Sequence, residues 1–253
     1  MPSSQDPKGA ASPSPPGMAA ARAQQIAQEL KRLGACAEVQ EWLHSIPTRP
    51  QATTQTTMQT TAQAAQVQDA AGVWRTVTAP PWLCWISVRL LGMQGLRAPL
   101  AVVRHTASLA VHPTADALLQ LCEDHISEKR VSENHTPKRA EDSQALFQGA
   151  YDASQAALTG AAKNPQALLA IAYLAHAIAQ VKDAQEEKDP ERKRKKEIRA
   201  ASQAADAAAF AWDAAGQNAT QDLARMTLAI RTAIPEAQIL KAWDLAMREN
   251  PHE

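Results

Sequence analysis

The chain has 253 residues, enough to bury a substantial core, and its 26 basic residues balance its 26 acidic residues. This zero net charge lacks the basic excess that binding to nucleic acid or to an anionic membrane favours, so neither partner is indicated. Alanine supplies 54 residues, and its high helix propensity and small side chain favour closely packed helices.

The N-terminus and the cysteines indicate a cytoplasmic protein. Residues 1–17 are rich in proline and serine, which predicts a disordered tail. They lack the apolar segment of a secretory signal, so we do not expect secretion. Cys36, Cys84 and Cys122 have no paired spacing, so we expect them to be reduced. The longest nearly apolar stretch, Ala167–Val181, has 15 residues. A membrane span needs about 20, so no membrane association is expected.

Prolines at expected helix starts and glycines at expected stops divide residues 18–126 into a first helical half with a tryptophan-rich core. A Gln/Thr-rich segment at 51–61 is expected to be a mobile loop, followed by a helix that runs to Trp74. The other helices predicted here are Met18–Leu33, Ala35–Ile46, Pro81–Leu91, Ala98–Val111 and Pro113–Ile126.

A polar connection at 127–138 is the expected boundary before an alanine-rich second half at 139–253. The helices predicted there are Pro137–Leu158, Pro165–Val181, Pro190–Ala215, Thr220–Ile234 and Pro235–Met247. No useful segment alternates apolar and polar residues with the period of a strand. The sequence therefore predicts an all-α fold, a bundle of about ten helices with antiparallel, alanine-rich hairpins.

Two of these helices carry patterns that predict their buried faces. On the helix at 190–215, large or apolar residues recur every seven positions with alanines between them, which predicts a narrow seam against the preceding helix. Its members are Ile198, Ala201, Ala205, Ala208, Trp212 and Ala215. In the helix at 137–158, Phe147, Tyr151 and Leu158 are in register on one face.

A charged hairpin tip at 182–197 contains the one strong charge run and the candidate partner-binding residues. These are Arg192, Lys193, Arg194, Lys195 and Lys196, with Lys129 and Arg130 in the polar connection. The alternative is a solvated hairpin end, because acidic residues before Pro190 neutralise the basic run. On either interpretation, reversing Arg192, Arg194 and Lys196 to Glu is expected to leave the melting temperature nearly unchanged.

Residues with catalytic or metal-binding potential do not form a complete site in the sequence. Cys122 and His125 share a helix face, but a structural zinc site needs four ligands and no further pair has suitable spacing. His105 and His112 are likewise isolated. No nucleophile or phosphate-binding motif occurs, and Cys84, between two tryptophans, is expected to be inert. We therefore expect no enzyme activity, no metal and no cofactor.

Several segments resemble a family of alanine-rich, all-helical bacterial and phage proteins. The similar segments are LGACAEVQEWL, the tryptophan at 74, WLCWISVRLLG and the ending LARMTLAIRTAIPEAQILKAW. The motif positions Ala35, Cys36, Glu38, Trp42, Trp82 and Trp85 look structural. Some similar proteins are labelled immunity proteins of polymorphic-toxin systems.

The resemblance and the absence of a catalytic motif together predict a non-enzymatic protein-binding module. Its partner would be another protein, and the specific hypothesis is a cytoplasmic immunity protein that neutralises a toxin by occlusion. The alternative is a structural or scaffolding subunit that forms homo-oligomers through its alanine seams.

Overall fold

A computed structural model of the chain describes residues 16–35, 69–127, 136–216 and 219–249, and its described residues contain helices and no strand. The helices of the first half are α1 (Pro16–Arg32), α4 (Ala70–Thr76), α5 (Pro80–Leu91), η1 (Gly92–Leu96), α6 (Arg97–Thr106), η2 (Ala107–Leu109) and α7 (Pro113–Ser127). Those of the second are α8 (Thr136–Leu158), α9 (Pro165–Glu186), α10 (Pro190–Ala215), α11 (Ala219–Ala233) and α12 (Glu236–Glu249). The all-α prediction is confirmed.

Several predicted segments fall wholly or largely outside the described residues. They are most of the tail at 1–17, the helix Ala35–Ile46, the loop at 51–61 and most of the polar connection at 127–138. The largest differences from the predicted boundaries are in α9, which continues beyond Val181 to Glu186, and in α6, which ends at Thr106 where the prediction ran to Val111.

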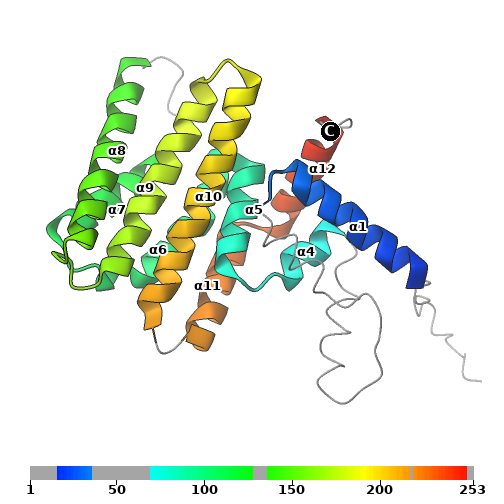
Figure 1. The fold of residues 1–253 in the computed structure, drawn as a ribbon, viewed down its shortest axis with the longest axis horizontal. Helices are drawn as coiled ribbons and strands as arrows, with labels where there is room; N and C mark the ends of the chain where they lie inside the picture. The colour runs from blue at the N-terminus through cyan, green and yellow to red at the C-terminus, as the bar shows by residue number, and fades with distance from the viewer. Residues whose placement is uncertain (1–15, 36–68, 128–135, 217–218, 250–253) are drawn as a thin grey trace, which may run out of the picture.

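The helices form two layers with a smaller group at one end (Figure 1). In the first layer α8, α9 and α10 lie side by side, and α9 packs against both neighbours. Behind them, α7 packs against α8 and α9, while α5, α6 and α11 pack against α10. At the other end, α1, α4 and α12 lie together (Figure 1). Helices from both expected halves therefore share one core.

The helices α9 and α10 both begin at a proline, as predicted, and a polar side chain caps each of them. Asn164 accepts a hydrogen bond from the Ala167 N–H at 3.1 Å, and Asp189 accepts one from the Arg192 N–H at 2.8 Å. Pro165 and Pro190 occupy first-turn positions, where a backbone N–H has no partner within the helix. These local signals account for both helix starts.

The buried face of α10 is wider than the predicted seam. It consists entirely of alanines, at 200, 201, 204, 207, 208 and 211. Ala201 and Ala208 are buried as expected, but Ile198, Ala205 and Trp212 are only half-buried. The reason is that α10 lies between α9 and α5 and must present small residues to both. A heptad seam describes one partner only.

On α8 the predicted apolar face was wrong at Tyr151 and Leu158, whereas Phe147 is half-buried and packs against the core. Tyr151 and Leu158 are 58% and 74% exposed, whereas Leu146, Ala150, Ala153 and Ala157 are buried. The alanine stripe faces α9 because its small side chains allow the two helix axes to approach closely. The side chains of Tyr151 and Leu158 therefore remain on the outer face of the layer.

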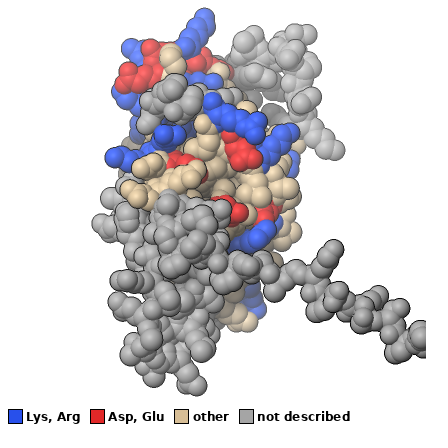
Figure 2. All heavy atoms as spheres, turned by 90° about the vertical axis from the view of Figure 1, so that its right-hand side faces the viewer, with Lys and Arg blue, Asp and Glu red and all other residues tan. Residues whose placement is uncertain are grey.

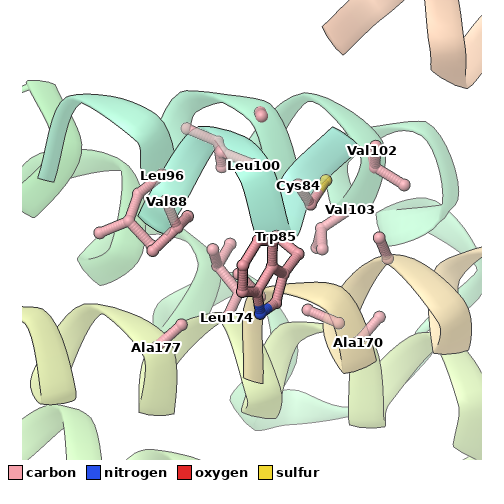
Figure 3. Packing of buried hydrophobic residues seen from close by; sticks show 14 of the residues in the cluster. Cys84, Trp85, Val88, Leu96, Leu100, Val102, Val103, Ala170, Leu174 and Ala177 are labelled. Atoms are coloured by element: carbon pink, nitrogen blue, oxygen red, sulfur yellow. The ribbon is translucent and has the colours of Figure 1, made fainter. Parts of the chain in front are cut away.

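Helix α5 supplies the bulky side chains that the alanine-rich helices lack. Trp85 points from α5 toward Leu174 and Ala170 of α9, beside Cys84 and Val88 of its own helix (Figure 3). Trp74 and Trp243 are also buried, and Trp82 and Trp212 pack against the same core while remaining half-buried. A core position is thus confirmed for three of the six tryptophans, and Trp42 lies outside the described residues.

Polar contacts of Arg231 on α11 and Glu236 on α12 hold α4 in the end group. Arg231 Nη2 donates to the carbonyl oxygens of Trp74 and Val77, each at 3.0 Å, at the C-terminal end of α4. The carboxylate of Glu236 on α12 forms an ion pair with Arg75 of α4. A cation at a helix C-terminus satisfies carbonyls that have no partner within the helix.

Two helical segments, Pro80–Leu109 and Pro165–Glu186, are long and apolar enough to cross a membrane. The most apolar windows of these segments are 56% and 67% buried inside the protein. Burial in the core accounts for their composition, as it does for the central helices of many water-soluble proteins.

Gly95 provides a test of the packing between η1 and α5. A Cβ at this position would lie 2.1 Å from the backbone oxygen of Ser87. Because backbone cannot move aside like a side chain, we expect Gly95→Ala to lower the free energy of unfolding by about 3 kcal/mol. Urea denaturation measures this change. Gly149→Ala is the matched control, since its Cβ meets the flexible end of Leu118, and we expect it to shift stability by less than about 1 kcal/mol.

Candidate functional site

The charged hairpin tip, residues 182–197, contains the end of α9 at Glu186, the turn that follows it and the start of α10 at Pro190. Figure 2 shows Lys and Arg side chains intermixed with Asp and Glu at the top of the molecule. Glu187 Oε1 accepts hydrogen bonds from the backbone N–H groups of Lys188 and Asp189, at 3.1 and 3.3 Å. The tip is therefore an ordered turn of mixed charge.

Two residues of the basic run bind the ends of other helices. Arg194 Nη2 donates to the Arg32 carbonyl at 3.0 Å, at the C-terminus of α1. Lys196 Nζ donates to the Asp183 carbonyl at 3.4 Å in α9 and forms a 3.1 Å ion pair with Glu187. The hydrogen bond from Lys196 is the main reason that the pKa of Glu187 is lowered. Arg194 and Lys196 are thus structural cations.

Arg89 of α5 also binds the end of α1, and it contacts α10 as well. Its Nε donates to the Leu33 carbonyl at 2.7 Å, and its Nη1 lies 3.2 Å from Glu197 Oε2. Burial lowers the pKa of this guanidinium, and the attraction of Glu197 opposes that effect. Through Arg89 and Arg194, the end of α1 is fixed against α5 and α10.

The remaining predicted basic residues are differently placed. Arg192, Lys193 and Lys195 are exposed, and Lys195 forms a 2.7 Å ion pair with Glu191 one turn earlier on α10. Lys129 and Arg130 lie outside the described residues. The structure thus separates the candidates of the tip into two structural cations and three that face solvent.

Beside the tip, a cleft of about 790 Å³ opens between the ends of several helices. Its walls come from the C-terminal ends of α1, α5 and α9, the first turns of α10 and the last turns of α12. The lining includes Lys193 and Arg194 of the predicted set. It also includes Arg32, Arg89, Glu191, Glu197, Leu245 and Met247.

The wall formed by α12 could not be anticipated from sequence. Leu245 lines the cleft while 55% exposed, so the fold leaves a large apolar side chain uncovered there. On the other side of α12, Trp243 is buried and its Nε1 donates to Glu29 of α1 at 2.8 Å. This bond joins residues 214 positions apart. The sequence signals for α12, the proline at 235 and an amphipathic period, do not identify the helix against which it packs.

The histidines and cysteines singled out in the sequence have separate local contacts. The His125 ring lies 2.9 Å from Lys182 Nζ, while His105 Nε2 lies 3.1 Å from Asp222 Oδ1. His112 Nδ1 contacts Thr114 Oγ1 at 2.8 Å. Among the described residues, no three His, Cys, Asp or Glu side chains are grouped in a way that would hold a metal ion.

Cys84 and Cys122 are buried thiols whose pKa values are raised by that burial. The thiolate is the reactive form, so both should resist modification while the protein is folded. In a Cys36→Ser variant, we expect a colourless disulfide reagent at pH 8 to label them only at the rate of unfolding, as followed by absorbance. Fast labelling of the native variant would contradict this. The same variant in denaturant, expected to react fully at once, is the control.

The contacts of Arg194 change the expected effect of charge reversal at the tip. We expect Arg194→Gln to lower the free energy of unfolding by about 1–2 kcal/mol, because the Arg32 carbonyl loses a charged donor. The exposed Arg192, two residues earlier, is the control, and Arg192→Gln should change it by less than about 0.5 kcal/mol. Urea denaturation of both variants measures these changes in the free energy of unfolding. Equal stabilities would show that the contact between α10 and α1 contributes nothing.

Comparisons with protein-family models, curated proteins and solved structures found no match to this chain. The resemblance to alanine-rich bacterial and phage proteins, with its immunity label, therefore stays a prediction.

Proposed function

We propose that this chain is a non-enzymatic, cytoplasmic protein-binding module that uses the cleft beside the hairpin tip to occlude a partner, specifically a toxin that it neutralises. The observation that carries the proposal is Leu245, a large apolar side chain left 55% exposed within a charged cleft. Buried apolar anchors supply most of the affinity at protein interfaces, and surrounding charges mainly tune the association rate. The cleft offers both.

The lining of the cleft favours binding over catalysis. Among the residues that the structure describes, the lining contains arginine, lysine, glutamate, one glutamine and apolar residues, but no hydroxyl, thiol or imidazole side chain. Nucleophilic catalysis needs such a group beside a general base. The two glutamates have cationic neighbours, since Glu197 pairs with Arg89 and Glu191 with Lys195. These pairings suit an electrostatic rim better than a proton-transfer site.

A second candidate function, self-association as a scaffold, is favoured by the outer face of α8–α10. Tyr151 and Leu158 are exposed there on α8. Next to them, a row of half-buried rings crosses the layer: Phe147 lies 5.8 Å from His176, and Tyr173 lies 5.0 Å from Phe210. Such apolar faces can be sites of protein contact. A homo-oligomer formed through this face would use large side chains rather than alanine seams.

A growth assay tests the first candidate. Cells that express the product of the gene immediately upstream are compared with and without this chain. We expect the wild-type chain to restore growth and Leu245→Gln to fail, because the variant loses an interface anchor. Leu228→Gln is the matched control, since Leu228 of α11 is 66% exposed and does not line the cleft. Equal rescue by both variants would rule out the cleft.

Light scattering separates the second candidate from the first. A monomer mass of 27.2 kDa at all concentrations would argue against the scaffold. A larger mass that Tyr151→Gln and Leu158→Gln reduce to the monomer value would establish association through α8.

A further inference from the structure

The cleft beside the tip has two chemically different sides. On α12, Leu245 and Ala246 follow Ala242 by three and four residues, so the three side chains form one apolar stripe on the helix. Met247 and Leu90 of α5 extend this apolar side. Across the cleft, α10 and the end of α1 present charged side chains. An occupant must therefore be amphipathic.

The charged side has a positive excess. Four cations line the cleft, Arg32, Arg89, Lys193 and Arg194, against two anions, Glu191 and Glu197, which leaves a difference of two positive charges. Both anions are already engaged, Glu197 by Arg89 and Glu191 by Lys195, which lies outside the lining. The cleft thus complements an anionic group better than a cationic one.

At the end of α1, two backbone carbonyls that would repel an anion are already bound. The carbonyl oxygens of Arg32 and Leu33, at the C-terminal end of α1, accept hydrogen bonds from Arg194 and Arg89. The N-terminus of α10 lies on the same side and carries a partial positive charge from its aligned peptide dipoles.

We propose that the cleft binds an acidic amphipathic helix of the partner protein. The proposal rests on the binding function proposed above and names its ligand chemistry. Apolar side chains of the bound helix, at positions i, i+3 or i+4 and i+7, pack on the stripe that contains Leu245. Its acidic side faces Lys193 and the other cations. A nucleic acid fits less well, because it has no apolar side chains to cover the wall formed by Ala242, Leu245 and Ala246.

The experiment uses a defined probe with the full-length chain. The probe is a fluorescein-labelled synthetic peptide of about 18 residues, with leucine at helical spacing and glutamate at most other positions. A matched peptide carries lysine in place of every glutamate. Fluorescence anisotropy at low and at moderate salt gives the two dissociation constants. We expect the acidic peptide to bind at least about tenfold more tightly, with the difference shrinking as salt rises.

Two variants with matched controls locate the binding. Lys193→Glu is expected to weaken binding of the acidic peptide about three- to tenfold, and Leu245→Gln about 30-fold. Lys163→Glu, at an exposed site in the loop before α9, and Leu228→Gln should bind like the wild type. Thermal melting of each variant checks that it is folded, and all four changes lie on the surface.

Other outcomes overturn the proposal in distinguishable ways. Equal binding of the acidic and basic peptides would reject the ligand chemistry. The ligand chemistry would also be rejected if a 20-nucleotide RNA displaced the probe at the same concentration as the unlabelled acidic peptide does. If no peptide binds while Leu245→Gln still abolishes rescue in the growth assay, the proposed function stands and the acidic helix is wrong. If the peptide binds but the growth assay fails, the cleft has this chemistry and the partner is not the upstream product.

Discussion

The close approach of α9 and α10 is the constraint on which the remaining packing depends. Six buried alanines on α10 let its axis lie near both α9 and α5, and contacts between small residues favour the short end of the usual 8–10 Å range. Each alanine methyl contributes only about 0.8 kcal/mol on burial, so many are needed. Large side chains must then come from elsewhere, which explains why Trp85 and the rest of α5 occupy the centre.

Rigid packing along the hairpin determines where the charged tip lies and what it can contact. Because α10 is held on two sides, its first turns project past the core to the end of α1. There Arg194 and Arg89 bind carbonyls that α1 cannot satisfy within its own helix. The charge run is therefore partly structural. Neither proposed interpretation of the sequence, a partner-binding patch or a solvated end, included this role.

Sequence reasoning succeeded where the signals were local. The prolines at 165 and 190 marked the starts of α9 and α10, where Asn164 and Asp189 cap the two helices. It failed on α8 at Tyr151 and Leu158, which were expected on a buried face with Phe147 but are exposed. Periodicity tells which residues share a face, but only the neighbouring helix decides whether alanines or larger residues turn inward.

The residues of the cleft were harder to predict from the sequence than the helices were. Lys193 could be named from its charge run, but Leu245 is a single leucine in an ordinary amphipathic helix. What makes it unusual is the bond from Trp243 to Glu29, which fixes the opposite face of α12 against α1 and leaves Leu245 beside the tip. A contact between residues so far apart in the chain has no local signature. The cleft is therefore a property of how α1, α10 and α12 are joined, and Arg194 and Arg89, which bind carbonyls at the end of α1, also contribute to its positive charge.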